Sequence, residues 1–191
     1  MATIADAART PIEIRLINDS EPLVVGDDSN ISSVLSAVMD ELITEPTGVT
    51  PICKQIRAVG RRLKEMEGAL RASGKIALLV IMSDGESTDG NIADVLRPLE
   101  GLPLQVIVRI CTSEKEVGDF WQAITAQLNL DIFVLSQTKE EAMLIAESNS
   151  WLVYGEALHR LREFGVMEPA IDLLRYRQLS HSEIATVAQR L

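Results

Sequence analysis

The chain has 191 residues, 47% of them hydrophobic, so it can bury a sizeable core and is not expected to be disordered throughout. Its formal net charge of −10 argues against a surface for nucleic acid or an anionic membrane, because clustered lysine and arginine bind phosphate groups. The sequence shows no signal peptide at its start and no apolar run of membrane-spanning length. We therefore expect a soluble protein of the cytoplasm in which Cys53 and Cys111 are buried free thiols.

The N-terminal part of the chain predicts a hairpin and a helix. Residues 11–17 alternate in the manner of a half-exposed strand, and residues 23–25 are expected to return as its short antiparallel partner. Apolar side chains at helical spacing over residues 31–42 predict a helix that Ser29 or Asn30 caps.

A long helix and a buried strand come next. Pro51 suits the first helical position, and the helix is predicted to run to Ser73. Thr50 is expected to cap its start and Gly74 to stop it. The uninterrupted apolar run at residues 76–82 then predicts a strand that is covered on both faces, as in parallel sheets.

The remaining elements alternate at first and then become helical only. Strands are expected at residues 104–110 and 131–135, and helices at residues 91–99, 116–128, 151–164, 169–176 and 180–191. A further helix is expected to begin at Thr138, where Glu141 would complete a capping box. Ser180 and Glu183 have the same spacing at the start of the last helix.

Alternating strands and helices indicate an α/β fold. We expect a Rossmann-like, doubly wound and mostly parallel sheet with helices on both faces, formed by residues 11–148. Residues 149–191 are expected to form a C-terminal helical extension.

An acidic, hydroxyl-rich loop at residues 84–89 follows the apolar strand. Open α/β sheets place their ligand sites beyond the carboxyl ends of the strands, where this loop is expected to lie. Its oxygen donors, chiefly Asp84, Glu86 and Asp89, suit Mg²⁺, Mn²⁺ or Ca²⁺. The loop is therefore the sharpest site hypothesis in the sequence.

Several catalytic motifs are excluded. Residues 68–75 have the wrong spacing for a phosphate-binding loop, and the loop at Asp84 lacks the glycine and the final glutamate of an EF-hand. The sequence has no Gly-x-Ser-x-Gly elbow. Its two histidines, His159 and His181, are expected to be surface or packing residues of the helical tail. We therefore expect the protein not to be an enzyme.

Two short loops carry a family resemblance. Residues 47–51, Thr-Gly-Val-Thr-Pro, lead into the long helix, and residues 83–85, Ser-Asp-Gly, leave the apolar strand. In order and spacing these loops resemble the second and third motifs of a von Willebrand factor A-like domain of the intracellular type. The resemblance covers roughly residues 11–148.

The resemblance implies a metal-ion-dependent adhesion site. Thr50 would supply a hydroxyl oxygen and Asp84 a carboxylate to Mg²⁺ or a similar ion, either directly or through water. An acidic side chain of a protein partner would complete the octahedron. The alternative is that Thr50 caps its helix and Asp84 belongs to a turn.

The family's first motif, Asp-x-Ser-x-Ser, is missing. Residues 28–32 come near it, but Asn30 replaces the first serine and a helix cap is the better interpretation. The domain is therefore expected to be N-terminally incomplete, without the family's central first strand. Two strand edges would then be left open, at residues 12–17 and 76–82. The chain could pair those strands directly, accept a strand from a partner, or be an incomplete gene product.

These observations predict a non-catalytic protein-interaction module whose partial adhesion site binds a divalent cation weakly or not at all. One alternative is a metal-dependent hydrolase or phosphoryl-transfer enzyme that uses the Asp84 loop. Another is a structural assembly subunit that binds its partner through the helical tail, around Trp151, Tyr154 and Tyr176. The sequence leaves the partner and the oligomeric state open.

Overall fold

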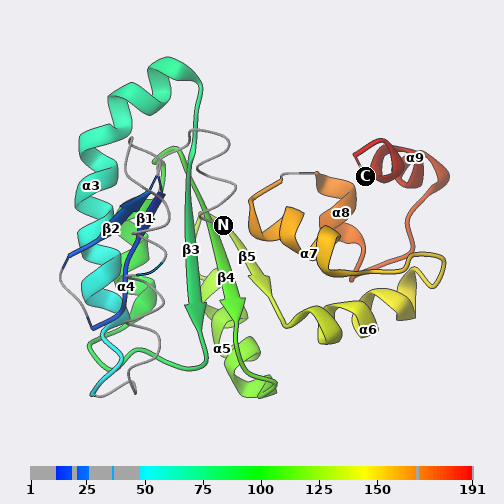
Figure 1. The fold of residues 1–191 in the computed structure, drawn as a ribbon, viewed down its shortest axis with the longest axis horizontal. Helices are drawn as coiled ribbons and strands as arrows, with labels where there is room; N and C mark the ends of the chain where they lie inside the picture. The colour runs from blue at the N-terminus through cyan, green and yellow to red at the C-terminus, as the bar shows by residue number, and fades with distance from the viewer. Residues whose placement is uncertain (1–11, 19–20, 26–35, 37–47, 167, 191) are drawn as a thin grey trace. The chain divides into compact units, whose positions relative to one another are not determined.

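The structure is a computed structural model that describes residues 12–18, 21–25, 36, 48–166 and 168–190 (Figure 1). It divides into two compact units, residues 1–59 with 87–92 and residues 60–86 with 93–191. The helix predicted over residues 31–42 lies outside the described residues except for Ser36, which is helical.

A two-stranded hairpin belongs to the first unit. Strand β1 (Ile12–Ile14) pairs antiparallel with β2 (Leu23–Val25), so both predicted strands are confirmed. β1 is shorter than expected, because the chain leaves the ladder after Ile14. The carbonyl oxygens of Leu16 and Ile17 instead accept hydrogen bonds from the Gln55 side-chain amide at 3.2 and 3.0 Å.

Helix α3 (Ile52–Ser73) starts and ends within a residue of its predicted bounds. Its end has a local cause: Gly74 adopts a φ of +64°, which a residue with a Cβ atom rarely adopts. The N–H groups of Gly74 and Lys75 donate to the carbonyl oxygens of Arg71 and Leu70, so the last turn is satisfied.

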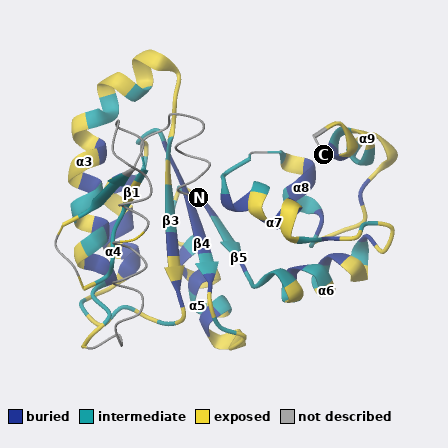
Figure 2. Cartoon of the chain, in the orientation of Figure 1, coloured by how far each residue is buried: buried dark blue, intermediate teal, exposed yellow. Residues whose placement is uncertain are grey.

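A parallel three-stranded sheet forms the centre of the second unit. Its strands are β3 (Ala77–Ser83), β4 (Leu104–Ile110) and β5 (Asp131–Leu135), in the order β3-β4-β5. Figure 2 shows β4 as buried along almost its whole length, whereas β3 includes exposed residues. All three strands were predicted, but the expectation that residues 76–82 are covered on both faces is wrong, because Leu78 and Met82 are exposed. The described strands form two separate sheets, so β1 and β3 do not pair directly.

Short helices connect the parallel strands. They are α4 (Ile92–Leu96), which continues as the 3-10 turn η1 (Arg97–Leu99), α5 (Lys115–Thr125), and α6 (Thr138–Ser148), which follows β5. Trp121 of α5 is fully buried, and α5 contacts both β4 and β5. The second unit is thus mixed α/β, with a parallel sheet flanked by helices.

The C-terminal residues form α7 (Glu156–Glu163), α8 (Pro169–Leu173) and α9 (His181–Arg190). The helix predicted at residues 151–164 begins only at Glu156. Residues 151–155 before it are not helical, and Tyr154 among them is buried. These helices and α6 enclose a hydrophobic cluster of Ile145, Tyr154, Leu158, Ala170, Ile171, Leu174, Leu179 and Val187. No helix among the described residues is long and apolar enough to cross a membrane.

The predicted capping box of the last helix is confirmed. The Ser180 N–H donates to the Glu183 carboxylate at 2.8 Å, and the Glu183 N–H donates to the Ser180 hydroxyl oxygen at 3.4 Å. The two residues thus satisfy one another's N–H groups at the start of α9.

Gly165, directly after α7, lies very close to the sheet. A Cβ atom at this position would stand 2.8 Å from Oε1 of Gln105 on β4 and 2.9 Å from Cδ1 of Leu78 on β3. The residue also has a φ of +69°. Both the backbone angle and the close approach therefore require glycine here.

We predict that Gly165→Ala lowers the free energy of unfolding by about 2–4 kcal/mol, the sum of left-handed backbone strain and overpacking. Gly101→Ala is the matched control, because Gly101 has a similar φ of +79° but open space where Cβ would stand. It should lose only about 1–2 kcal/mol. Urea denaturation of both variants measures the difference, and equal losses would mean that Gly165 does not touch the sheet.

Candidate functional site

The loop that enters α3 is held by hydrogen bonds to the loop that follows β3. The Thr50 N–H donates to the Thr88 hydroxyl at 2.9 Å, and the Thr88 N–H donates to the Thr50 carbonyl at 3.0 Å. The Ser87 hydroxyl lies 3.4 Å from the buried thiol of Cys53. The structure thus brings Thr50 together with residues of the acidic loop.

Asp89 caps α3. Its two carboxylate oxygens accept hydrogen bonds from the N–H groups of Cys53 at 2.9 Å and Lys54 at 2.7 Å. The Ser87 hydroxyl donates to the same carboxylate at 2.6 Å. The negative charge also lies at the positive end of the dipole of a 22-residue helix. The predicted Thr50 side-chain cap is therefore replaced by a carboxylate from the acidic loop.

These hydrogen bonds set the protonation of two groups. Partial burial raises the pKa of Asp89, but the bonds from Ser87, Cys53 and Lys54 outweigh it and hold this pKa below its usual value. Burial raises the pKa of the Cys53 thiol, and the nearby Asp89 charge adds to the rise. Cys53 is therefore a protonated packing residue at neutral pH, not a nucleophile. Its predicted burial is confirmed, whereas the predicted burial of Cys111 is wrong, because that residue, directly after β4, is exposed.

Asp84 lies at the end of β3, in the second unit. Ser83 makes a tight local turn there: its hydroxyl donates to the Gly85 carbonyl at 2.8 Å and accepts from the Gly85 N–H at 3.2 Å. Asp84 is exposed, and no hydrogen bond within the described part of the chain involves its carboxylate. This arrangement keeps the Asp84 carboxylate in solvent.

The described residues do not fit a tightly bound cation. They contain no cluster of three or more His, Cys, Asp or Glu side chains with the geometry of a metal site. Both oxygens of Asp89, the acid bonded beside Thr50, already accept N–H groups of α3. The Thr88 hydroxyl likewise accepts the Thr50 N–H. The oxygen donors of Asp89 and Thr88 are therefore engaged in holding the backbone, whereas the Asp84 carboxylate is exposed to solvent.

A second cluster, which the sequence did not predict, surrounds Glu141 on α6. Glu141 is fully buried, and its carboxylate accepts hydrogen bonds from Arg162 at 2.7 Å, Arg175 at 3.0 Å and the Ser136 N–H at 3.1 Å. The capping box predicted for Thr138 and Glu141 is thus wrong. The only signal in the sequence for this cluster was the position of Glu141 itself. It lies four residues before Ile145 and therefore on the buried face of α6.

His159 of α7 extends this cluster towards β4. The histidine is fully buried, its Nδ1 lies 2.9 Å from the Tyr154 hydroxyl, and its Nε2 contacts Arg109. Burial first, and then the Arg109 charge, lower the pKa of His159 to about 4. The ring is therefore neutral at pH 7, and the prediction of a packing residue is confirmed for His159.

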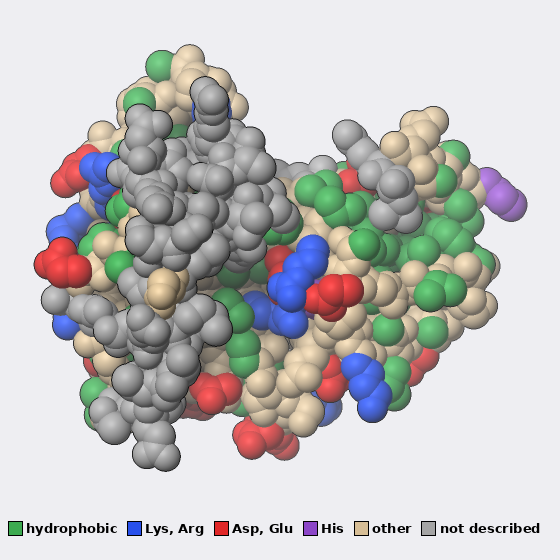
Figure 3. Space-filling model, in the orientation of Figure 1, with side chains coloured by type: hydrophobic (Ala, Val, Ile, Leu, Met, Phe, Trp, Pro, Cys, Tyr) green, Lys and Arg blue, Asp and Glu red, His purple; other side chains and the backbone are tan. Residues whose placement is uncertain are grey.

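Ion pairs complete this region. Glu163 pairs with Arg109 and also with Arg160, whose guanidinium reaches Glu156 at 2.7 Å. Figure 3 shows such basic and acidic side chains side by side over α7. Each buried charge near β4 thus has a partner of opposite sign, as a dry environment requires.

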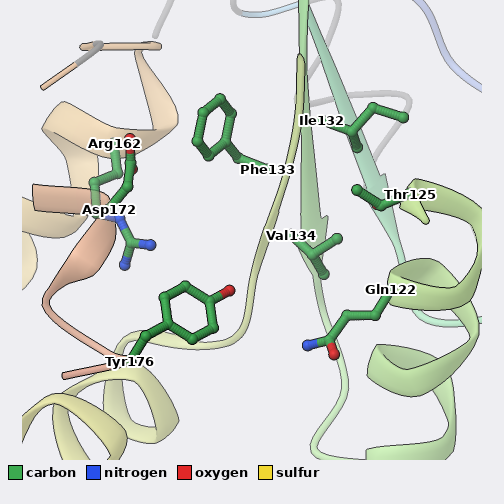
Figure 4. Close-up of a pocket in the computed structure, with 8 residues that line it drawn as sticks. All are labelled: Gln122, Thr125, Ile132, Phe133, Val134, Arg162, Asp172 and Tyr176. Atoms are coloured by element: carbon green, nitrogen blue, oxygen red, sulfur yellow. The ribbon is translucent and has the colours of Figure 1, made fainter. Parts of the chain in front are cut away.

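A pocket of about 270 Å³ lies beside β5 (Figure 4). Its lining consists of Gln122, Thr125, Ile132, Phe133, Val134, Arg162, Asp172 and Tyr176. Burial raises the pKa of Asp172 to about 6. However, Arg162 is paired with Glu141 and the Thr125 hydroxyl donates to the Trp121 carbonyl, so we assign the pocket no ligand.

We predict that Asp89→Ala lowers the free energy of unfolding by about 1–2 kcal/mol at pH 7, because α3 loses its cap. Since the pKa of Asp89 is lowered, this stabilisation is present above the pKa of the unfolded chain and is lost as the pH falls through the folded pKa. Asp84→Ala, the same change at an exposed position of the same loop, should change stability by less than about 0.5 kcal/mol. Urea denaturation compares the two, and equal effects would argue against the cap.

A second prediction concerns His159. Its pKa is about 4 in the folded protein against 6.5 in the unfolded chain, so the unfolded chain takes up a proton first as the pH falls. The free energy of unfolding should decrease by up to about 3 kcal/mol between pH 6.5 and 4. This part of the pH dependence should disappear in His159→Gln and remain in His181→Gln, a change at an exposed histidine. Denaturation curves across this range test it, and an unchanged slope in His159→Gln would contradict it.

No protein-family model, no curated protein and no solved structure matches this chain. The resemblance of its two loops to a von Willebrand factor A-like domain therefore stays a prediction.

Proposed function

We propose that the chain is a non-catalytic protein-interaction module of the von Willebrand factor A-like type. Residues 11–148 would form the domain, with a doubly wound, Rossmann-like sheet that carries helices on both faces. Residues 149–191 would form its helical extension. Thr50 and Asp84 are the residues of the adhesion site that this chain retains.

The observation that supports this proposal most is the pairing of the two loops. Thr50 and Thr88 exchange two hydrogen bonds, although they lie 38 residues apart in the sequence. Asp89 then fixes the start of α3 from the same loop. A loop before a long helix is thereby held against the loop that follows the parallel strand β3. The resemblance implies that these two loops are neighbours, so this contact supports the proposal.

The metal part of the proposal is limited by the same contacts. A hard cation needs several free oxygen ligands, and the nearest carboxylate and hydroxyl beside Thr50 already accept backbone N–H groups. We therefore propose that a divalent cation binds weakly or not at all. An acidic side chain of a protein partner would then meet the Thr50 and Asp84 loops with little help from a metal.

The chemistry of the described side chains favours binding over catalysis. The Cys53 thiol is buried with a raised pKa, and His159 is buried among arginines. Tyr154, expected on a contact surface of the tail, is buried and bonded to Arg162 and His159. Of the three tail residues expected at a contact surface, Tyr154 is thus unavailable to a partner, whereas Trp151 and Tyr176 are exposed.

We predict that Mg²⁺ at 1 mM raises the unfolding free energy of the wild-type chain by about 0.1 kcal/mol or less, as expected for a dissociation constant of about 10 mM. Thermal unfolding with and without Mg²⁺, beside isothermal titration, measures this. Asp84→Ala and Thr50→Val serve as matched variants and should show the same lack of response. A micromolar affinity that Asp84→Ala removes would show that the loops hold a complete metal site.

The same variants test the functional class. Protein partners captured by the wild-type chain should be lost with Asp84→Ala and retained with Asp119→Ala, a change at an exposed carboxylate of α5. A metal-dependent hydrolytic or phosphoryl-transfer activity that Asp84→Asn abolishes would overturn the proposal in favour of an enzyme.

A further inference from the structure

Strand β3 forms one edge of the parallel sheet, and its backbone is used on one side only. The Ala77 N–H donates to the Pro103 carbonyl at 2.8 Å, and the Ser83 carbonyl accepts the Cys111 N–H at 2.9 Å. Because the N–H and C=O of one strand residue point to the same side, residues 77, 79, 81 and 83 face β4. The N–H and C=O groups of Leu78, Val80 and Met82 therefore face away from β4.

Within the described part of the chain, no hydrogen bond reaches these outward groups. Their side chains are apolar, and Leu78 and Met82 are 37% and 62% exposed. Proteins usually block such an edge with a charge, a proline or a bulge, and β3 has none of these over its seven residues. The edge is therefore suited to receive another strand.

The two ends of β3 carry opposite charges. Lys75 precedes the strand, and Asp84 and Glu86 follow it, all of them exposed. A strand that ran parallel to β3 in a second copy would place lysine beside lysine and acid beside acid. An antiparallel second copy would place Lys75 beside the acidic end of its partner, so opposite charges would meet at both ends.

We propose that two copies of this chain associate through β3, in antiparallel orientation, around a two-fold axis at Val80. This register pairs Val80 with its own copy and Leu78 with Met82, so that every outward group of the strand gains a partner. Closed two-fold symmetry requires this self-complementary arrangement. The sheets of the two copies join into one continuous sheet. The proposal does not depend on the adhesion-site function, because it uses only the edge of β3 and the charges at the two ends of that strand.

Sedimentation velocity of the full chain over a range of concentrations tests the proposal. The wild-type chain should be a dimer, and Val80→Pro should be a monomer with an unchanged circular dichroism spectrum. Proline is compatible with the fold here because the Val80 N–H makes no bond to β4. Met82→Lys should also lose the dimer, whereas Met143→Lys should keep it. Met143 lies on α6 and is 62% exposed, the same value as Met82.

A cross-link tests the register. In a hydrogen-bonded antiparallel pair the two Cα atoms are about 5.5 Å apart, which a disulfide can span. Val80→Cys in a Cys111→Ser background should therefore give a reducible dimer on mild oxidation, and Cys111→Ser alone should not. A wild-type chain that stays monomeric at all concentrations would overturn the proposal and leave the edge to a strand of another protein. Dimers that survive both Val80→Pro and Met82→Lys would overturn it as well.

Discussion

The contact between the Asp89 carboxylate and the first turn of α3 is the interaction on which the arrangement of the two loops depends. The first N–H groups of a helix have no partner within the helix, so an oxygen from elsewhere has to satisfy them. Here the oxygen comes from a residue 35 to 36 positions further along the chain. The helix start and the loop after β3 therefore stabilise one another. Capping and cation binding compete for the same carboxylate oxygens, so a cation bound at Asp89 would have to displace the hydrogen bonds that order the loops.

A second constraint acts in the C-terminal part of the chain, where charges are buried. Burying a carboxylate such as that of Glu141 away from water costs roughly several kcal/mol, unless hydrogen bonds replace the lost hydration. Three donors do so, and two of them are the guanidinium groups of Arg162 and Arg175. These bonds have directions, so they fix α6, α7 and the segment after α8 in one arrangement, which apolar packing alone would leave less defined. The neutral state of His159 follows from the same environment, because a further positive charge would face Arg109.

Local patterns predicted most of the described elements, whereas contacts between distant residues did not follow from them. The strand at residues 76–82 and the cap of Ser180 with Glu183 depend on neighbours within a few positions, and both are confirmed within a residue. Thr138 and Glu141 have the same spacing, yet Glu141 bonds to Arg162 and Arg175, which lie 21 and 34 positions away. The loop that contains Thr50 was likewise predicted from the sequence. The capping of the following helix, α3, by Asp89 was not predicted. In both cases the hydrogen bond forms with a partner that is far away in the sequence, not with the partner that the local pattern suggests. The spacing of residues along the sequence cannot reveal such a distant partner.

The charge of the chain explains how an uncharged strand edge can be tolerated. A net charge of −10 opposes random association between copies, because most approaches bring acidic surfaces together. An approach that aligns Lys75 with the acidic end of β3 meets less repulsion, and it also satisfies the backbone groups of Leu78, Val80 and Met82. Charge and hydrogen bonding thus select the same orientation. Other proteins prevent edge-to-edge association with charges or prolines on the edge strand itself. Here the negative charge of the rest of the surface has that role, so the edge of β3 can accept one specific partner.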